Sequence, residues 1–181
     1  MLTIPATATK SAPPRSASTT PLPPAVALYE ATPADLPWLD RLARDEAVEP
    51  FLATDAASRL RDALAAGEVL VATVDGDPVG AVRAVVENRR SRIASIRTLM
   101  VAPAARGRGI GLAMIHAVVA RLIGDLGMHR VEAEVYGFNH GGLRAFAAAG
   151  FTREGARRRA YDRHGDWQDG VLYAYLADEP G

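Results

Sequence analysis

The stretch "VAPAARGRGIGLAMIHAVVARLIG", Val101 to Gly124, decides the fold. It starts as an extended apolar run and then has three glycines and two arginines within Arg106–Gly111. Apolar residues at helical spacing follow. A loop between a strand and a helix presents unpaired backbone N–H groups and the positive end of the helix dipole. Glycines allow positive φ and let phosphate oxygens come close to the backbone. We predict that this loop binds a pyrophosphate.

Two other phosphate-binding motifs do not match this loop. A P-loop requires a Gly-Lys-Ser/Thr sequence, and neither the lysine nor the hydroxyl is present. The dinucleotide fingerprint requires two residues between its last glycines, whereas Gly107, Gly109 and Gly111 alternate. The preceding strands are also antiparallel in character, which does not suit a doubly wound sheet. A glycine turn without a ligand is the alternative that the loop alone leaves open.

Composition excludes several classes of function. The 181 residues predict one domain, and their formal net charge of zero disfavours binding to nucleic acids or to membrane surfaces. The sequence has no cysteine, which excludes disulfides, thiolate zinc sites and a cysteine nucleophile. The four histidines show no metal-ligand spacing, so no metal is expected. No apolar run reaches membrane length and no secretory signal is recognisable, so we expect a cytoplasmic protein.

The first 25 residues differ from the rest of the chain. Residues 1–24 hold six of the 12 prolines and are otherwise rich in Ala, Ser and Thr. Such a segment buries too little apolar area to offset its ordering entropy. We expect residues 1–25 to be a disordered tail and residues 26–178 to form the domain.

The pattern of apolar residues predicts the order of the elements in the domain. A short strand at 26–31 precedes a helix that starts at Thr32, and a second helix is expected at 55–66. Two β-rich runs join at Asp75–Pro78 as a hairpin, and residues 92–101 form a further strand. After the glycine loop come a helix to Gly127, a strand at 129–136, a helix at 139–150 and a strand at 170–177. The prediction is a mixed α/β fold with a mostly antiparallel central sheet and helices on both faces.

The motifs together resemble a known family. The sequence Arg106-x-x-Gly109-x-Gly111 after "TLMVAP", followed by an apolar helix, Asn139 and Gly150-Phe151, resembles the GNAT superfamily of acetyl-CoA-dependent N-acetyltransferases. The resemblance runs from about residue 28 to residue 176. The segment "GFTREGARRRAYDRHGDWQDGVLYAYL" is similar to the endings of ribosomal-protein N-terminal acetyltransferases and of phosphinothricin-type acetyltransferases.

The resemblance implies an acyl-CoA N-acyltransferase fold and a set of cofactor contacts. The pyrophosphate contacts fall on Arg106, Gly107, Arg108, Gly109, Ile110 and Gly111. The pantetheine contacts fall on backbone atoms of Leu99, Met100 and Val101. Asn139 and Phe146 complete the expected cofactor contacts, and Asn139 can also cap its helix.

Glu134 is the candidate general base. It precedes Asn139 by five residues, where the ribosomal alanine acetyltransferases carry a glutamate thought to accept the amine proton through water. Alternation places Glu132, Glu134 and Tyr136 on one strand face. A solvated face is the other interpretation, and for Glu132 it is the preferred one.

The family's usual acid is a tyrosine seven residues after the helix-starting asparagine. Phe146 occupies that position and cannot donate a proton. Tyr136 is a weak candidate replacement, with Tyr161 and Tyr173 as further possibilities. A coenzyme A thiolate leaves without assistance at a fair rate, because thiol pKa values are about 8.5.

The acceptor site is the least defined part of the prediction. Trp38, Trp167 and Asp169 are weak candidates for lining it. A cluster of five arginines after Gly150 is expected to lie in a solvated loop: Arg153, Arg157, Arg158, Arg159 and Arg163.

The sequence thus predicts an acetyl-CoA-dependent N-acetyltransferase. We expect direct transfer to a primary amine of a small molecule or a peptide N-terminus, since a covalent cysteine intermediate is unavailable. The alternative is an acyl-CoA-binding sensor or assembly module with little or no catalysis. Neither a nucleic acid nor a membrane is expected as a partner, and the protein is expected to be a monomer or a homodimer.

Overall fold

The computed structural model describes residues 25–163 and 165–179. The predicted tail lies outside the described residues, except for its last residue. The elements follow one another as β1 (Ala27–Glu30), α1 (Leu36–Ala43), α2 (Leu60–Ala65), β2 (Val69–Val74), β3 (Asp77–Asn88), β4 (Ile93–Val101), α3 (Ile110–Ala120), β5 (Arg130–Tyr136), α4 (His140–Ala148), β6 (Thr152–Arg163) and β7 (Asp166–Leu176). Short 3₁₀ turns at Pro33–Asp35, Glu49–Phe51 (η2) and Pro103–Ala105, and a π-helical turn at Arg121–Asp125, complete the order.

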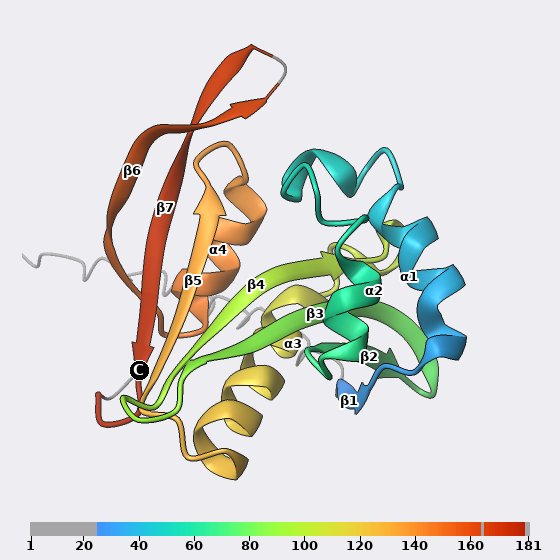
Figure 1. The fold of residues 1–181 in the computed structure, drawn as a ribbon, viewed down its shortest axis with the longest axis horizontal. Coiled ribbons are helices and arrows are strands. Elements are labelled where there is room, and N and C mark those ends of the chain that lie inside the picture. The colour runs from blue at the N-terminus through green and yellow to red at the C-terminus, as the bar shows by residue number, and fades with distance from the viewer. Residues whose placement is uncertain (1–24, 164, 180–181) are drawn as a thin grey trace, which may run out of the picture.

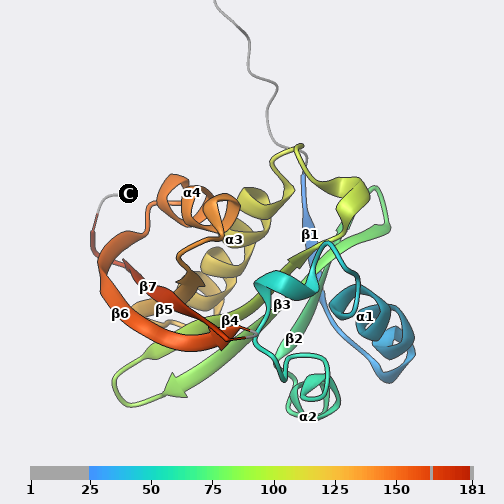
Figure 2. The same cartoon turned by 90° about the horizontal axis from the view of Figure 1, so that it is seen from above.

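Seven strands form one sheet in the order β1-β2-β3-β4-β5-β7-β6. Every neighbouring pair is antiparallel except β4 and β5, which run parallel. Helices α1 and α2 cover one face of the sheet, and α3 and α4 cover the other (Figures 1 and 2). The prediction of a mixed, mostly antiparallel sheet between helical layers is confirmed.

Two apolar cores lie on the two faces of the sheet. The larger one packs α3 and α4 against the sheet and includes the fully buried Met114 and Ile115 of α3. The smaller one packs α1 and α2 against β2 and β3 and includes Leu39, which is also fully buried. Strand β5 shows the expected alternation, because Val131, Ala133 and Val135 are buried in the larger core while the residues between them face the other side.

The local turn signals act as predicted. Asp75 and Gly76 have φ of 53° and 89° and form the two-residue connection between β2 and β3. At the start of the first helical segment, the Thr32 N–H donates to the Asp35 carboxylate at 2.7 Å.

The second helix begins later than predicted. Residues 54–59 form turns, and α2 starts only at Leu60. The Ser58 hydroxyl donates to the Asp55 carbonyl oxygen at 2.8 Å, a local bond that competes with helical hydrogen bonding.

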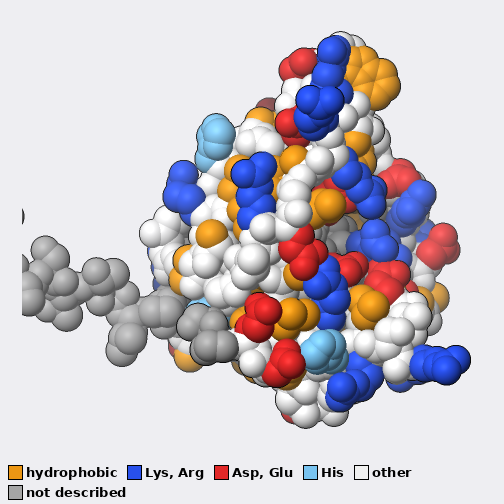
Figure 3. Space-filling model, turned by 90° about the vertical axis from the view of Figure 1, so that its left-hand side faces the viewer, with side chains coloured by type: hydrophobic (Ala, Val, Ile, Leu, Met, Phe, Trp, Pro, Cys, Tyr) orange, Lys and Arg blue, Asp and Glu red, His pale blue; other side chains and the backbone are white. Residues whose placement is uncertain are grey.

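The arginine cluster is not in a loop, as the sequence suggested, but in the strand β6. Strand β6 is the last strand of the sheet, so one of its edges has no neighbour and most of its side chains are exposed. An edge strand needs no apolar alternation, and charged side chains are common there. On the side of the molecule shown in Figure 3, basic and acidic side chains are interspersed and not separated by sign.

Candidate active site

A cavity opens where β4 and β5 part. The two strands pair only from Ile93 opposite Arg130 to Ile96 opposite Ala133. Directly after Ile96, Arg97 is an extra residue in the register between β3 and β4. Such a bulge increases the local twist of a strand. The end of β4 therefore diverges from β5, and residues of both strands line a cavity of about 560 Å³.

The glycine loop has the backbone conformation and the charges that the sequence predicted. Gly107 and Gly109 have φ of 74° and 77°, a left-handed conformation that side chains with a Cβ rarely adopt. Gly109 is the N-cap of α3, whose first N–H groups have no partner within the helix. Arg106 and Arg108 are both exposed beside these groups. The predicted residues therefore combine free N–H donors, a helix N-terminus and two positive charges.

Most of the remaining predicted cofactor residues belong to the cavity wall. Leu99, Met100, Asn139 and Phe146 line the cavity. The Val101 carbonyl oxygen accepts a hydrogen bond from Arg106 Nε at 3.2 Å. This bond connects the end of β4 to the start of the glycine loop.

Asn139 caps α4. Its side-chain oxygen accepts a hydrogen bond from the Gly142 N–H at 2.9 Å. A Cβ on Gly142 would lie 2.8 Å from the Asn139 side-chain nitrogen and 3.0 Å from a methyl carbon of Val135. Gly142 thus allows α4 to approach β5 closely.

Phe146 lies in the larger core with 6% of its surface exposed. Its ring packs edge-on against Phe151 at 5.0 Å and stacks on Tyr173 at 6.1 Å between centroids. Phe146, at the position where the GNAT superfamily usually has a tyrosine acid, is therefore part of an aromatic cluster in the core.

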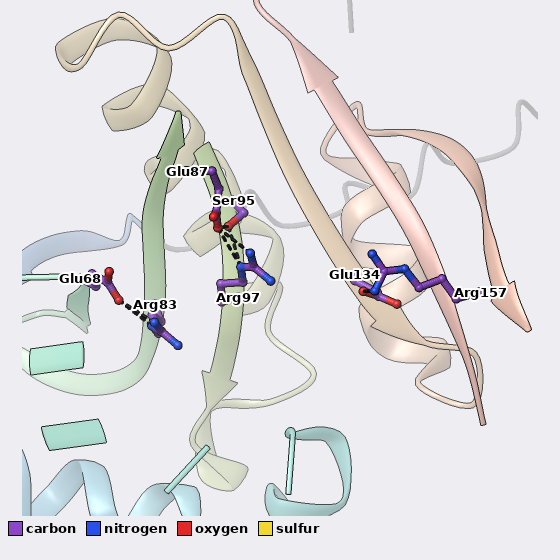
Figure 4. A network of polar contacts seen from close by, with 7 residues as sticks. All are labelled: Glu68, Arg83, Glu87, Ser95, Arg97, Glu134 and Arg157. Atoms are coloured by element: carbon purple, nitrogen blue, oxygen red, sulfur yellow. Dashed lines mark hydrogen bonds and ion pairs between the residues drawn. The ribbon is translucent and has the colours of Figure 1, made fainter. Parts of the chain in front are cut away.

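Glu134 extends into the cavity from β5. Its side chain is 25% exposed, and Oε1 is buried without a hydrogen-bond partner among the described residues. The carboxylate lies over Gly170 of β7, where an added Cβ would come within 2.1 Å of Oε1 and 2.8 Å of a ring carbon of Tyr161. The other oxygen, Oε2, is 3.6 Å from the Arg157 guanidinium. Figure 4 shows Glu134 and Arg157 together, apart from the other ion pairs of this face.

Glu132 takes a different role from Glu134. Its side chain is 43% exposed and accepts a hydrogen bond from Arg130 at 2.7 Å. Arg130 also binds Glu154, which lowers the pKa of the Glu154 carboxyl. Glu132 is therefore a surface ion-pair partner, in agreement with the preferred interpretation from the sequence.

Three tyrosines lie near Glu134 or Phe146. Burial, followed by the neighbouring Glu134 carboxylate, raises the pKa of Tyr161. Burial also raises the pKa of Tyr136, and the Arg163 guanidinium opposes this shift. Both hydroxyls stay protonated at neutral pH. Tyr173 is 7% exposed, and its hydroxyl donates to the Leu143 carbonyl oxygen at 3.5 Å inside the larger core.

Comparisons with known proteins identify the family of the chain. The model of the acetyltransferase (GNAT) family matches residues 23–151. The chain belongs to the GNAT acetyltransferase family. Mycothiol acetyltransferase from Sanguibacter keddieii is 36% identical over an alignment that covers 77% of this chain and 48% of that protein, so the chain spans about half of this curated relative.

Solved acetyltransferase structures share the fold. Spermidine N-acetyltransferase from Vibrio cholerae, in complex with CoA and spermine, superposes with a TM-score of 0.73 at 18% identity and covers 83% of this chain and 95% of that one. RimJ from Mycobacterium smegmatis, in complex with CoA-disulfide, has a TM-score of 0.69 at 26% identity, covering 84% and 82%.

The three predicted acceptor residues do not line the cavity of this GNAT domain. Trp38 is partly buried against the smaller core, and Trp167 is 50% exposed in the β6–β7 hairpin. The Asp169 carboxylate accepts a hydrogen bond from the Arg159 N–H at 2.8 Å. Arg159 has a φ of 49° within the irregular part of β6, so Asp169 stabilises that bulge.

Sequence reasoning missed several residues around the cavity. Phe51 lines it, and so does the hydrogen-bonded cluster of Glu87, Ser95 and Arg97 that Figure 4 shows. None of these residues belongs to a recognisable motif. Gly170, beside Glu134, was also missed, although a glycine inside a strand signals a close approach by another group.

Neither a metal site nor a membrane span is recognisable in the described part of the chain. Across residues 25–163 and 165–179, no three His, Asp or Glu side chains converge to hold a metal ion. No helix in the same ranges combines the length and apolarity needed to cross a bilayer.

Proposed function

We propose that this protein transfers an acetyl group from acetyl-CoA directly to a primary amine of a small molecule or a peptide N-terminus. The observation that carries the proposal is the position of the Glu134 carboxylate, in the cavity where β4 and β5 stop pairing. Its Oε1 is buried and has no hydrogen-bond partner among the described residues. An unpaired carboxylate oxygen costs free energy unless a ligand pairs with it. A protonated amine supplies the missing partner.

The co-substrate follows the path from the glycine loop to the cavity. Backbone N–H groups and side chains of Arg106–Gly111 would hold the pyrophosphate. The backbone of Leu99, Met100 and Val101 would bind the pantetheine arm, because β5 no longer pairs with this part of β4. Asn139 and Phe146 would flank the thioester end.

Glu134 would act as the general base. An amine with a pKa of about 10.4 is neutral in only about one molecule in 2,500 at pH 7, whereas an α-amine near pKa 8 is neutral in about one in ten. The carboxylate accepts the ammonium proton, directly or through water, and frees the nitrogen lone pair. The nitrogen then attacks the thioester carbonyl carbon and the C–S bond breaks as the carbonyl reforms. The nitrogen loses its second proton to water, and the departing sulfur leaves as a thiolate or takes up a proton to leave as the thiol.

Tyr136 is the candidate acid for the departing thiolate. It shares the strand face of Glu134, and its raised pKa keeps the hydroxyl protonated. Phe146 cannot donate a proton, so the thiolate would otherwise leave unassisted. The other candidates for acceptor contacts are Trp38 of α1 and two residues of the β6–β7 hairpin, Trp167 and Asp169.

We further propose a branch and a setting for this enzyme. The C-terminal segment supports the ribosomal-protein N-terminal acetyltransferase branch and leaves the phosphinothricin-type branch open. The domain would comprise residues 26–178 and act in the cytoplasm as a monomer or homodimer, without a metal.

Release of free coenzyme A thiol during steady-state turnover with a panel of amines tests the function. Glu134→Gln should lower kcat at pH 7 by about 100-fold or more, the typical contribution of a general base, with little change in acetyl-CoA affinity by calorimetry. Glu68→Gln is the matched control. Glu68 is 23% exposed and also pairs with an arginine, Arg83, but does not line the cavity (Figure 4).

Two results would contradict the proposal. Coenzyme A binding without thiol release above hydrolysis would identify a binding module and not an enzyme. An unchanged kcat in Glu134→Gln would remove the base assignment alone.

A further inference from the structure

One arginine fastens the loop after α1 to the β6–β7 hairpin. The Arg163 guanidinium donates to the Leu52 carbonyl oxygen at 2.9 Å and to the Pro50 carbonyl oxygen at 3.2 Å. It also lies 3.4 Å from both the carbonyl oxygen and the carboxylate of Glu49. The Arg163 side chain is only 9% exposed. The η2 turn is therefore held by a residue more than a hundred positions further along the chain.

The fastened turn places Phe51 at the end of a row of four aromatic rings. Phe51 lies 5.9 Å from Phe138, Phe138 stacks on Tyr136 at 5.4 Å, and Tyr136 meets Tyr161 edge-on at 5.2 Å, all measured between ring centroids. The Arg163 guanidinium carbon lies 5.7 Å from the centre of the Tyr136 ring. We call these four residues the aromatic row.

The aromatic row adjoins the candidate base. Phe51, Tyr136 and Tyr161 line the same cavity as Glu134. The ring of Tyr161 and the Glu134 carboxylate meet over Gly170. Phe51 is 40% exposed although it is large and apolar, so part of its side chain is open to solvent. The substituent of an amine bound at Glu134 would therefore lie in a cavity that these rings line.

The other acids of the cavity are already paired with arginines. Each of them lies within 2.8 Å of a guanidinium: Asp55 with Arg59, Glu87 with Arg97, and Glu132 and Glu154 with Arg130. Glu134 is the only described cavity acid with a buried carboxylate oxygen that lacks a hydrogen-bond partner. Glu134 has only the more distant Arg157, at 3.6 Å, so a polyamine with several positive charges would find only one carboxylate here without a close guanidinium partner.

We propose that the acceptor is a monoamine whose neighbouring substituent is aromatic, and that Arg163 is the positioning residue that keeps the aromatic row in place. This substrate class rests on the proposed acetyl transfer at Glu134. Ring packing of the substituent against the row, together with cation–π attraction for the ammonium, provides the selectivity.

Matched acceptors that differ only by a phenyl group test the class. Phenethylamine is compared with ethylamine, and the dipeptide Phe-Gly with Ala-Gly, by thiol release from acetyl-CoA. We expect kcat/KM to be about 10- to 100-fold higher for the aryl member of each pair, the range expected for filling an apolar pocket. Spermine serves as the multiply charged comparison and should react more slowly than phenethylamine.

Two variants locate the selectivity. Phe51→Ala should reduce the aryl preference, the ratio of kcat/KM within each pair, by about tenfold. Arg163→Gln should raise KM for the aryl acceptor by a similar factor and leave KM for acetyl-CoA unchanged. Arg158→Gln, at an exposed arginine of the same strand, is the control. Because Phe51 is partly exposed, its variant keeps the test valid even if Arg163→Gln unfolds the protein.

Failure of the substrate class is distinguishable from failure of the function. Equal or faster turnover of ethylamine, Ala-Gly or spermine would overturn the aromatic class while the acetyl transfer stands. An unchanged aryl preference in Phe51→Ala would do the same. Absence of turnover with every amine would overturn the proposed function and the substrate class together.

Discussion

Replacing Gly170 by alanine would move the Glu134 carboxylate without removing it. The new Cβ would lie 2.1 Å from Oε1, and ordinary van der Waals contact begins at 3.4 Å, so the oxygen must move by about 1.3 Å. The Tyr161 ring carbon at 2.8 Å must also shift. A misplacement of about 1 Å in an active site can cost about 100-fold in rate. We expect Gly170→Ala to lower kcat by about that factor.

Stability should change far less than activity in this variant. The clashing carboxylate is the end of a flexible side chain, so it can swing away at low cost. Gly155 provides the control, because it lies on the neighbouring strand β6 opposite Leu172 and nothing lies within 4 Å of an added Cβ. Alanine there should leave kcat unchanged and, by restricting the unfolded chain, stabilise the fold by up to about 1 kcal/mol.

Thiol-release kinetics and thermal denaturation of both variants decide the question. Wild-type kcat in Gly170→Ala would refute the assignment of the carboxylate to catalysis. An equal loss of kcat in Gly155→Ala would show that the hairpin tolerates no side chain at either position. The loss in Gly170→Ala would then not result from displacement of the Glu134 carboxylate.

Two further predictions concern the loop and the polar cluster. Gly109→Ala should weaken acetyl-CoA binding by about tenfold in calorimetry, because an L side chain at φ of 77° costs about 1–2 kcal/mol and the loop relieves it by leaving its anion-binding shape. Gly76→Ala, with a φ of 89° in the β2–β3 turn, carries similar strain and should leave affinity unchanged; an equal loss in both would contradict the assignment of the loop. A hydrogen bond from Ser95, supported by the Arg97 guanidinium, lowers the pKa of Glu87 below its ordinary 4.5. The ionised Glu87 carboxylate therefore stabilises the folded state fully above pH 4.5. This stabilisation is lost as the pH falls through the lower pKa of Glu87 in the folded state. The difference in melting temperature between the wild type and Glu87→Gln should shrink in that acidic range, and a difference that stays constant down to pH 3 would contradict the shift.

The sequence predicted best where a feature depends on neighbours in the chain. Gly107 and Gly109 provide backbone conformations that other residues avoid, so the loop was recognisable from its glycines. Alternation along β5 placed Glu134 on the face of the strand opposite to the face that carries the buried Val135. Asn139 was expected to cap a helix, and it does so.

Strand β6 shows where sequence reasoning failed. Its side chains carry no apolar alternation, since an edge strand with both faces largely exposed does not require one. The residues of β6 form a strand because they pair with β7. This pairing depends on backbone hydrogen bonds to a segment on the other side of the turn.

The sequence by itself determined the family, the conformation of the glycine loop and the strand face that carries the candidate base. These features depend on backbone conformation and on side-chain periodicity, which are local properties of the chain. Only the tertiary structure decided which groups surround Glu134. Phe51 and Arg163 are 112 positions apart in the sequence, yet both act on one cavity wall, because contacts between distant segments form only once the sheet is assembled.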